Sequence, residues 1–259
     1  MLTLALTAAL MAAAPVEDAD DVDADDARQF FELRVYRNDD TAAGDRVAAF
    51  ARDDLIPALN RAGVTPVGVF RPVAELNEGQ SAADVYVLIP YKTLADVTRV
   101  RDALARDEAY GAAEFLSAEG PAKYARIDTS LMRAFAGMPT MQVPPQTAGG
   151  EDRVFELRTY ESKTEERAAK KVDMFNAGEI DVMNEVGLAP VFYGETLIAS
   201  DAPNLRYMMS GPDVKTHAAN FQKFLDHPTW DRLKKDPQYA GTVSRITKTF
   251  LKPADGSQI

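Results

Sequence analysis

The chain has 259 residues and a formal net charge of −11, and it contains no cysteine. The length suits one large domain or two ordinary ones, and no basic stripe is present that would favour nucleic-acid binding. The lack of cysteine excludes disulfides, thiolate metal sites and a cysteine nucleophile.

The N-terminus predicts an exported protein. Residues 1–14, MLTLALTAALMAAA, form an apolar run that is too short to cross a bilayer. The run fits a secretory signal with Ala12–Ala14 as the cleavage site, although no Lys or Arg precedes it. Residues 15–27 come next as an acidic spacer that we expect to be disordered. We expect a periplasmic or extracellular protein without stable membrane insertion; the alternative is a disordered tail.

A strand pattern that occurs twice indicates an internal duplication. Residues 31–36, FELRVY, match residues 155–160, FELRTY, at five of six positions. The residues after each copy are collinear with only short shifts, and the matched pairs are Val47/Val172, Phe50/Phe175, Asn60/Asn184, Gly63/Gly187, Pro66/Pro190, Val67/Val191, Tyr86/Tyr207, Tyr110/Trp230 and Arg126-Ile127/Arg245-Ile246. We place module 1 at 28–135 and module 2 at 153–253, with a Pro- and Gly-rich linker at 136–152 and a tail at 254–259.

Each module predicts the order β-α-β-β-α-β, the ferredoxin-like split motif. The opening strand alternates between apolar and polar side chains. A helix at 44–62, kinked at Pro57, ends at Gly63, and its counterpart ends at Gly187. The remaining elements of module 1 are strands at 67–70, 85–89 and 126–134 and a helical region at 93–118 broken near Asp107. Those of module 2 are strands at 191–193, 205–209 and 242–251 and a helical region at 213–235 broken at Pro228.

These features together resemble the NIPSNAP family of the dimeric α+β barrel group. The resemblance rests on the Glu-Leu-Arg-x-Tyr strand, the helix that ends in Gly, the Pro-Val strand and the aromatic residue at Tyr110 or Trp230. It covers both modules and implies two sheets that face each other across a lumen, with helices outside. Because one tandem chain can supply both sheets, we expect an intramolecular pseudo-dimeric α+β barrel. Pairing between chains and further homo-oligomerisation stay open.

The alternation of the opening strands suggests where a ligand would bind. We expect the apolar face, which includes Phe31, Leu33 and Val35, to pack against the helices, so that the polar face points into the lumen. The candidate ligand-binding residues are then Glu32, Arg34, Tyr36, Glu156, Arg158 and Tyr160. On one interpretation they line a pocket for a small anionic or carbonyl ligand. On the other, the Glu and Arg side chains pair within or between modules and fix the strand register.

No other motif signals chemistry. His217 and His227 do not share a helix face as paired metal ligands would, so we expect no metal, and neither a phosphate loop nor a catalytic triad is recognisable. No cofactor is predicted, and catalytic residues are unknown. We expect Trp230 and Tyr110 to pack beneath the second helix rather than on a substrate. Three functions stay open: a barrel that binds a small organic ligand, a non-catalytic structural or interaction module, and a cofactor-free oxygenase- or isomerase-like enzyme.

Overall fold

The computed structural model describes residues 28–117, 123–145 and 153–259. The predicted signal run and acidic spacer lie outside these residues, as does part of the predicted linker. Within the described ranges, no helix has the length and apolar character needed to cross a membrane.

Module 1 has the predicted order of elements. Its strands are β1 (Phe30–Arg37), β2 (Gly68–Pro72), β3 (Val85–Tyr91) and β4 (Arg126–Ala134). Its helices are α1 (Thr41–Phe50), a π-helical segment (Ala51–Leu55), α2 (Ile56–Arg61), α3 (Leu94–Arg106) and α4 (Glu108–Gly111), with single 3-10 turns at Ala74–Leu76 and Glu114–Leu116. The predicted break lies at Asp107, which ends α3 and whose side chain accepts a hydrogen bond from the Tyr110 N–H at 2.9 Å.

Module 2 repeats this order. Its strands are β5 (Val154–Glu161), β6 (Pro190–Ile198), β7 (Asn204–Gly211) and β8 (Arg245–Pro253). Its helices are α5 (Glu165–Met174), a π-helical segment (Phe175–Glu179), α6 (Ile180–Glu185), α7 (Val214–Leu225) and α8 (Pro228–Lys235), with a 3-10 turn at Pro237–Tyr239. Pro228 occupies the first turn of α8, where its missing N–H breaks no helical hydrogen bond.

The first helix of each module ends at the predicted glycine but is not kinked by proline. Gly63 and Gly187 have φ angles of +83° and +80°, the left-handed conformation that glycine favours after a helix. The irregular turn before them is a π-helical segment at the same place in both modules. Module 2 has Asp181 where module 1 has Pro57. The irregularity therefore belongs to the shared backbone, and Pro57 lies in the first turn of α2, where it is tolerated.

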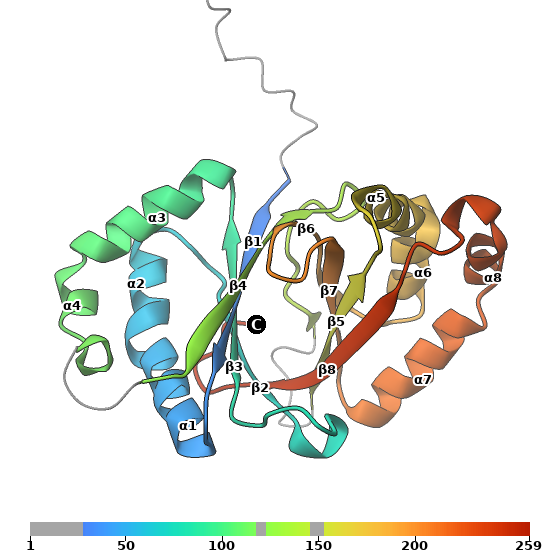
Figure 1. Cartoon of the computed structure of the whole chain (residues 1–259). Coiled ribbons are helices and arrows are strands. Elements are labelled where there is room, and N and C mark those ends of the chain that lie inside the picture. The colour runs from blue at the N-terminus through green and yellow to red at the C-terminus, as the bar shows by residue number, and fades with distance from the viewer. Residues whose placement is uncertain (1–27, 118–122, 146–152) are drawn as a thin grey trace, which may run out of the picture.

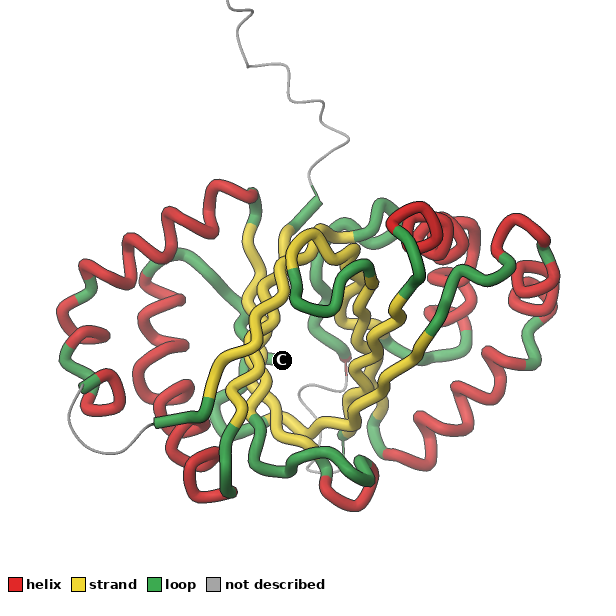
Figure 2. Tube along the Cα trace, in the orientation of Figure 1, coloured by secondary structure: helices red, strands yellow, loops and turns green. Residues whose placement is uncertain are grey.

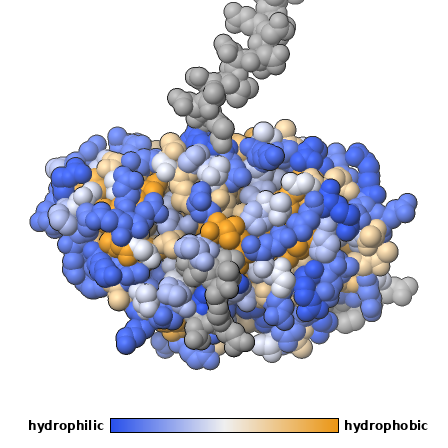
Figure 3. Space-filling model, turned by 180° about the vertical axis from the view of Figure 1, so that it is seen from behind, coloured by the Kyte–Doolittle hydropathy of each residue, from blue (hydrophilic) through white to orange (hydrophobic). Residues whose placement is uncertain are grey.

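The eight strands close into one barrel in the order β1-β3-β2-β8-β5-β7-β6-β4. The modules meet along two antiparallel strand pairs, β2 with β8 and β4 with β6. Helices α1–α4 and α5–α8 cover the outside of the ring on opposite sides (Figures 1 and 2). The face seen from behind is mostly hydrophilic, with only small hydrophobic patches (Figure 3). The expected intramolecular pseudo-dimer is confirmed, because one chain supplies both sheets.

The interior of the barrel is lined mainly by buried apolar side chains. All eight strands contribute to one buried cluster there, which Ile259 joins: Phe31, Leu33, Val35, Phe70, Tyr86, Leu88, Met132, Ala134, Phe155, Leu157, Val191, Phe192, Met208, Leu251 and Ile259. Aromatic pairs hold the two sheets together, with ring centroids 5.2 Å apart for Phe31 and Phe192 and 4.9 Å for Phe70 and Phe155. No residue from the described helices belongs to this cluster.

The predicted orientation of the opening strands is therefore wrong. Phe31, Leu33 and Val35 point into the barrel, and the polar face of β1 points outward beneath the helices. The same holds for β5 in module 2. The space between the two sheets is filled mainly by apolar side chains, and buried polar residues that face it, such as Ser130 and Thr249, have short side chains. The helix-covered side supplies partners for the polar groups.

Candidate functional site

The six predicted ligand-binding residues lie outside the barrel, in two separate clusters rather than in a shared lumen. In module 1, Arg34 donates from Nε and Nη2 to the two carboxylate oxygens of Glu32, at 2.7 and 3.0 Å. The Tyr91 hydroxyl donates to the same carboxylate at 2.7 Å. Glu32 is only 2% exposed, and these three hydrogen bonds engage both of its carboxylate oxygens.

Module 2 keeps the ion pair but changes the third partner. Arg158 Nε lies 2.8 Å from Glu156 Oε1, and His217 Nε2 lies 2.8 Å from Glu156 Oε2. The residue at the register position of Tyr91 is Gly211, and a Cβ added there would lie 2.8 Å from the His217 Cβ. Because Gly211 on β7 has no side chain, α7 can lie close enough to the strand for the His217 imidazole to reach Glu156.

The charge state of these clusters is set by their contacts. Burial alone would raise the pKa of Glu156, but the hydrogen bond from His217 and the charge of Arg158 outweigh it, and the net pKa is lowered. The pKa of Glu32 is lowered in the same way, burial being outweighed by Arg34 and Tyr91. The within-module pairing that the sequence suggested is confirmed in both modules. Ligand binding by the six residues stays a prediction.

Two of the six, Arg158 and Tyr160, line a cavity of about 400 Å³ between the sheet of module 2 and helices α5, α7 and α8. Such a volume lies within the usual range for small-molecule sites. The lining is aromatic and aliphatic on the helix side and polar on the strand side; it consists of Arg158, Tyr160, Lys171, Met174, Phe221, Phe224, Leu225, Trp230, Lys234, Tyr239, Gly241, Thr242, Val243 and Ile246. Trp230 packs on Phe224 beneath α7, as predicted, and also forms part of the cavity wall.

The strand side of the cavity holds a polarised hydroxyl. The Tyr160 hydroxyl accepts hydrogen bonds from Arg158 Nη1 at 3.1 Å and from the Tyr207 hydroxyl at 2.8 Å. Burial raises the pKa of Tyr207 well above its ordinary value, so its phenol remains a neutral donor. The Arg158 guanidinium also stacks on Phe221, with Cζ 4.1 Å from the ring centroid. Because the oxygen of Tyr160 already accepts two hydrogen bonds, its own O–H group can act as a hydrogen-bond donor to a ligand.

A buried ion pair lies in the same wall. Lys171 Nζ is 2.7 Å from Glu179 Oε2 and 3.3 Å from Met174 Sδ. Lys171 is 3% exposed and Glu179 is 1% exposed. The ammonium lies 4.6 Å from the ring centroid of Phe175 and 5.3 Å from that of Trp230. Burial raises the pKa of Glu179, and the charge of Lys171 only partly offsets this.

Sequence reasoning missed this pair through a one-residue misalignment. From the start of α1 to Gly63, each helix boundary of module 1 lies 124 residues before its counterpart in module 2, which runs from the start of α5 to Gly187. Val47 therefore corresponds to Lys171, not to Val172, and Leu55 corresponds to Glu179. Both module 1 residues are fully buried aliphatic side chains. A strict offset of 124 along the first helix would have revealed two charges at core positions.

Module 1 fills the corresponding space with its own aromatic side chains. Phe115 stacks on Phe50 at a centroid distance of 4.3 Å, and Tyr124 stacks on Phe115 at 6.3 Å. Tyr124 also meets Tyr36 edge-on at 5.3 Å. The β4 and β8 registers place Val243 at the position of Tyr124. The smaller side chain leaves room in module 2.

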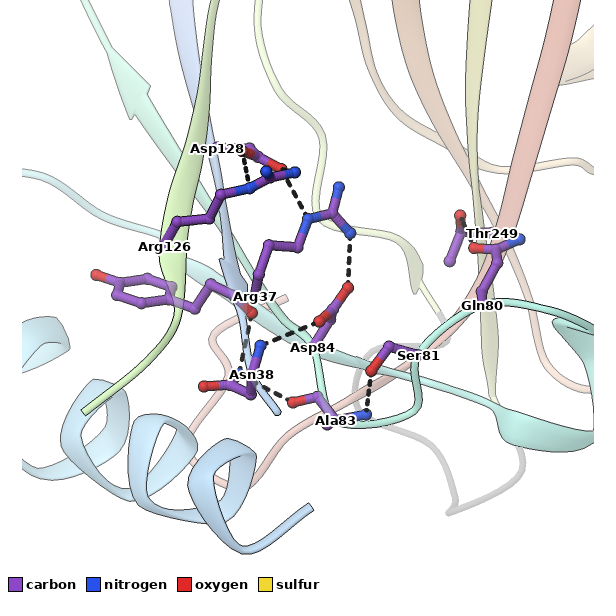
Figure 4. Close-up of polar contacts among 10 residues, drawn as sticks. Arg37, Asn38, Gln80, Ser81, Ala83, Asp84, Arg126, Asp128 and Thr249 are labelled. Atoms are coloured by element: carbon purple, nitrogen blue, oxygen red, sulfur yellow. Dashed lines mark hydrogen bonds and ion pairs between the residues drawn. The ribbon is translucent and has the colours of Figure 1, made fainter. Parts of the chain in front are cut away.

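A second cavity, of about 520 Å³, lies at one end of the barrel (Figure 4). Arg37 bridges two carboxylates there, with Nε 2.7 Å from Asp128 and Nη1 2.6 Å from Asp84. The Asn38 N–H donates to Asp84 at 3.3 Å. Because acidic and basic groups neutralise each other at this opening, it is a weaker candidate than the cavity of module 2. Among the described residues, no group of three potential His, Asp or Glu metal ligands occurs.

The closed ring of two ferredoxin-like sheets with helices outside defines a dimeric α+β barrel protein. A putative monooxygenase from Fusobacterium nucleatum has a similar fold, with a TM-score of 0.56, 8% identity and coverage of 88% of this chain and 94% of that one. A putative monooxygenase from Lactobacillus acidophilus gives a TM-score of 0.55, 11% identity and coverage of 89% and 97%. These likenesses concern the fold alone, and no curated protein matches the chain.

The NIPSNAP family model matches the chain twice, over residues 31–136 and 155–258. The chain belongs to the NIPSNAP family and carries two copies of its domain.

Proposed function

We propose that module 2 binds a small organic ligand in the cavity between β5 and helices α5, α7 and α8, and that module 1 is structural. The observation that carries the proposal is the contrast between two copies of one fold. Where module 1 has Val47 and Leu55, module 2 has the buried pair Lys171–Glu179 beside an open cavity.

Stability alone does not explain that pair. Well-packed aliphatic side chains often stabilise a fold as well as, or better than, a buried ion pair of similar volume. Module 1 keeps the aliphatic pair and an aromatic stack, which fits the structural interpretation of that module. Polar groups that converge on an apolar cavity are typical of a binding site.

The experiment is isothermal titration of the full chain with three probes of the same shape and different charge: 2-naphthoate, 2-naphthamide and 2-naphthylmethylamine. We expect at least one probe to bind with one molecule per chain. Val243→Tyr, which introduces the side chain that fills module 1, should abolish that binding. Tyr124→Val is the matched control in module 1 and should leave it unchanged. Binding that survives Val243→Tyr, or no binding of any probe at millimolar concentration, would contradict the proposal.

We also propose that the protein is exported. The apolar run at residues 1–14 and its small-residue end support this. The test is the N-terminal mass of the protein recovered from its native cells. A chain that begins just after Ala14, in the fraction outside the cytoplasm, is expected; an intact Met1 inside the cytoplasm would contradict it.

A further inference from the structure

We propose that the ligand of module 2 is a hydrophobic organic anion, that Lys171 binds its charged group, and that Glu179 takes up a proton when it does. The inference rests on the proposed function and specifies the chemistry of that same cavity.

The charged side chains that line the cavity are basic, and their carboxylate partners lie behind or beside the wall: Glu156 for Arg158, Glu179 for Lys171 and Asp231 for Lys234. Of the described residues that line it, none is acidic. The two carboxylates that pair with the inner cations, Glu156 and Glu179, are buried. A ligand in the cavity therefore meets cationic groups and aromatic rings first, which favours an anion with an apolar body.

The two inner cations are not equivalent. Arg158 is held from several sides, by Glu156, by the Tyr160 hydroxyl and by the ring of Phe221. Among the described residues, Lys171 has one carboxylate partner, Glu179, and a weak acceptor, Met174 Sδ, and its ammonium also lies against the rings of Phe175 and Trp230. An ammonium group has three donors. Lys171 is thus the cation that can turn to a ligand by giving up a single strong hydrogen bond, whereas Arg158 would give up two.

Loss of that contact would leave the buried Glu179 carboxylate without its hydrogen-bonded cation, with only the more distant charge of Arg158 acting on it. The titratable groups around it are Lys171 on α5, Arg158 on β5, Tyr193 on β6 and Tyr207 on β7. Both tyrosine hydroxyls already donate elsewhere, that of Tyr193 to Met183 Sδ and that of Tyr207 to Tyr160. A buried carboxylate without a partner takes up a proton rather than remain charged. Burial already raises the pKa of Glu179 while Lys171 is in place.

Binding of the anion leaves the charge of the wall balanced. The anion replaces the Glu179 carboxylate as the partner of the Lys171 ammonium, and one proton from solvent neutralises Glu179. The net charge of wall and ligand together is then the same as that of the wall before binding, and no bond is made or broken in the ligand. Because a proton is taken up with the anion, its affinity should fall as pH rises.

The test uses the same three probes with the full chain, titrated in phosphate and in Tris at one pH. The difference in observed heat between the two buffers gives the number of protons taken up. We expect 2-naphthoate to bind at least about ten-fold more tightly than 2-naphthamide, with uptake of about one proton. The cationic 2-naphthylmethylamine should bind most weakly.

Two variants separate the roles of the pair. Glu179→Gln should bind 2-naphthoate without proton uptake and at least as tightly as the parent chain. Lys171→Met should still bind 2-naphthamide but should bind 2-naphthoate no better than the amide. The amide also reports that the cavity of each variant is intact.

Failure of this inference is distinguishable from failure of the binding site itself. Equal affinity for naphthoate and naphthamide, no proton uptake by the parent chain, or a preference for naphthoate that survives Lys171→Met would each overturn the inference while the cavity still binds. If no probe binds, or if Val243→Tyr binds normally, the proposed site is wrong and the inference falls with it.

Discussion

The ammonium of Lys171 lies 2.7 Å from the carboxylate of Glu179 in a core where the other module has Val47 and Leu55. The two modules thus provide a comparison within one chain, because the same helix with the same π-helical turn is built with and without a buried ion pair. The pair is next to the cavity of module 2, and the aliphatic side chains are next to an aromatic stack.

The first prediction concerns the stability of that pair. Lys171→Val alone leaves Glu179 without a partner and should lower the free energy of unfolding by about 3–5 kcal/mol. The double variant Lys171→Val/Glu179→Leu copies module 1 and should be at least as stable as the parent chain. Urea denaturation of the parent chain, Lys171→Val, Glu179→Leu and the double variant gives the coupling energy. A double variant as unstable as the worse single variant would show that the pair itself stabilises the fold.

The second prediction concerns pH. Glu179 has a raised pKa in the folded chain, so its contribution to stability is fully present below about pH 4.3, the ordinary value, and is lost as pH rises through the folded pKa. The double variant lacks this carboxyl. Its stability relative to the parent chain should therefore increase as pH rises above about 4.3. A difference curve from urea denaturation that is flat with pH would contradict the raised pKa.

The third prediction concerns the third partner of each ion-paired glutamate. Tyr91→Phe removes the donor to Glu32 in module 1, and His217→Leu removes the donor to Glu156 in module 2. Each should lower the free energy of unfolding by about 1–3 kcal/mol, because a buried charged acceptor loses one hydrogen bond. Chemical denaturation measures both, with Tyr239→Phe as a half-buried control. Losses no larger than that of the control would show that these bonds are not needed.

The fourth prediction separates the barrel interior from the binding site. Phe155 is fully buried against Phe70 across the seam between the modules. Phe155→Ala should cost about 3–5 kcal/mol of stability and leave one probe site per chain. Leu94→Ala, on an exposed side chain, is the control for stability. A loss of probe binding by folded Phe155→Ala protein would indicate that the ligand lies in the barrel after all.

The order of elements and the pseudo-dimeric barrel could be predicted from the sequence because they depend on local signals. Gly63 and Gly187 end helices, Pro228 begins one, and the opening strands alternate with period two. The direction of that alternation could not be predicted, since a strand buried on both faces offers two dry environments. Which of these two environments contains Phe31 and which contains Arg34 is fixed only when the eight strands close into a barrel.

The site was harder to predict because it depends on single-residue register. The sequence pattern pairs Tyr86 with Tyr207. In the structure, however, Tyr86 lies opposite Val35 and faces the barrel interior, whereas Tyr207 lies opposite Arg158 and faces the helices. A shift of one residue in a strand moves a side chain to the other face. Likewise, Val243 is recognised as the residue that leaves the cavity open only when it is compared with Tyr124, and that comparison needs the register of β4 and β8.

Methyl NMR of the chain labelled at the methionine Cε positions would locate the ligand most directly. Met174 lines the proposed cavity, whereas Met132 and Met208 lie inside the barrel. Met174→Leu assigns the first signal. Saturation with 2-naphthoate, or with 2-naphthamide if the neutral probe binds better, should shift the Met174 signal and leave those of Met132 and Met208 in place. Shifts at Met132 and Met208 with an unchanged Met174 signal would place the ligand in the barrel and contradict a binding site in module 2.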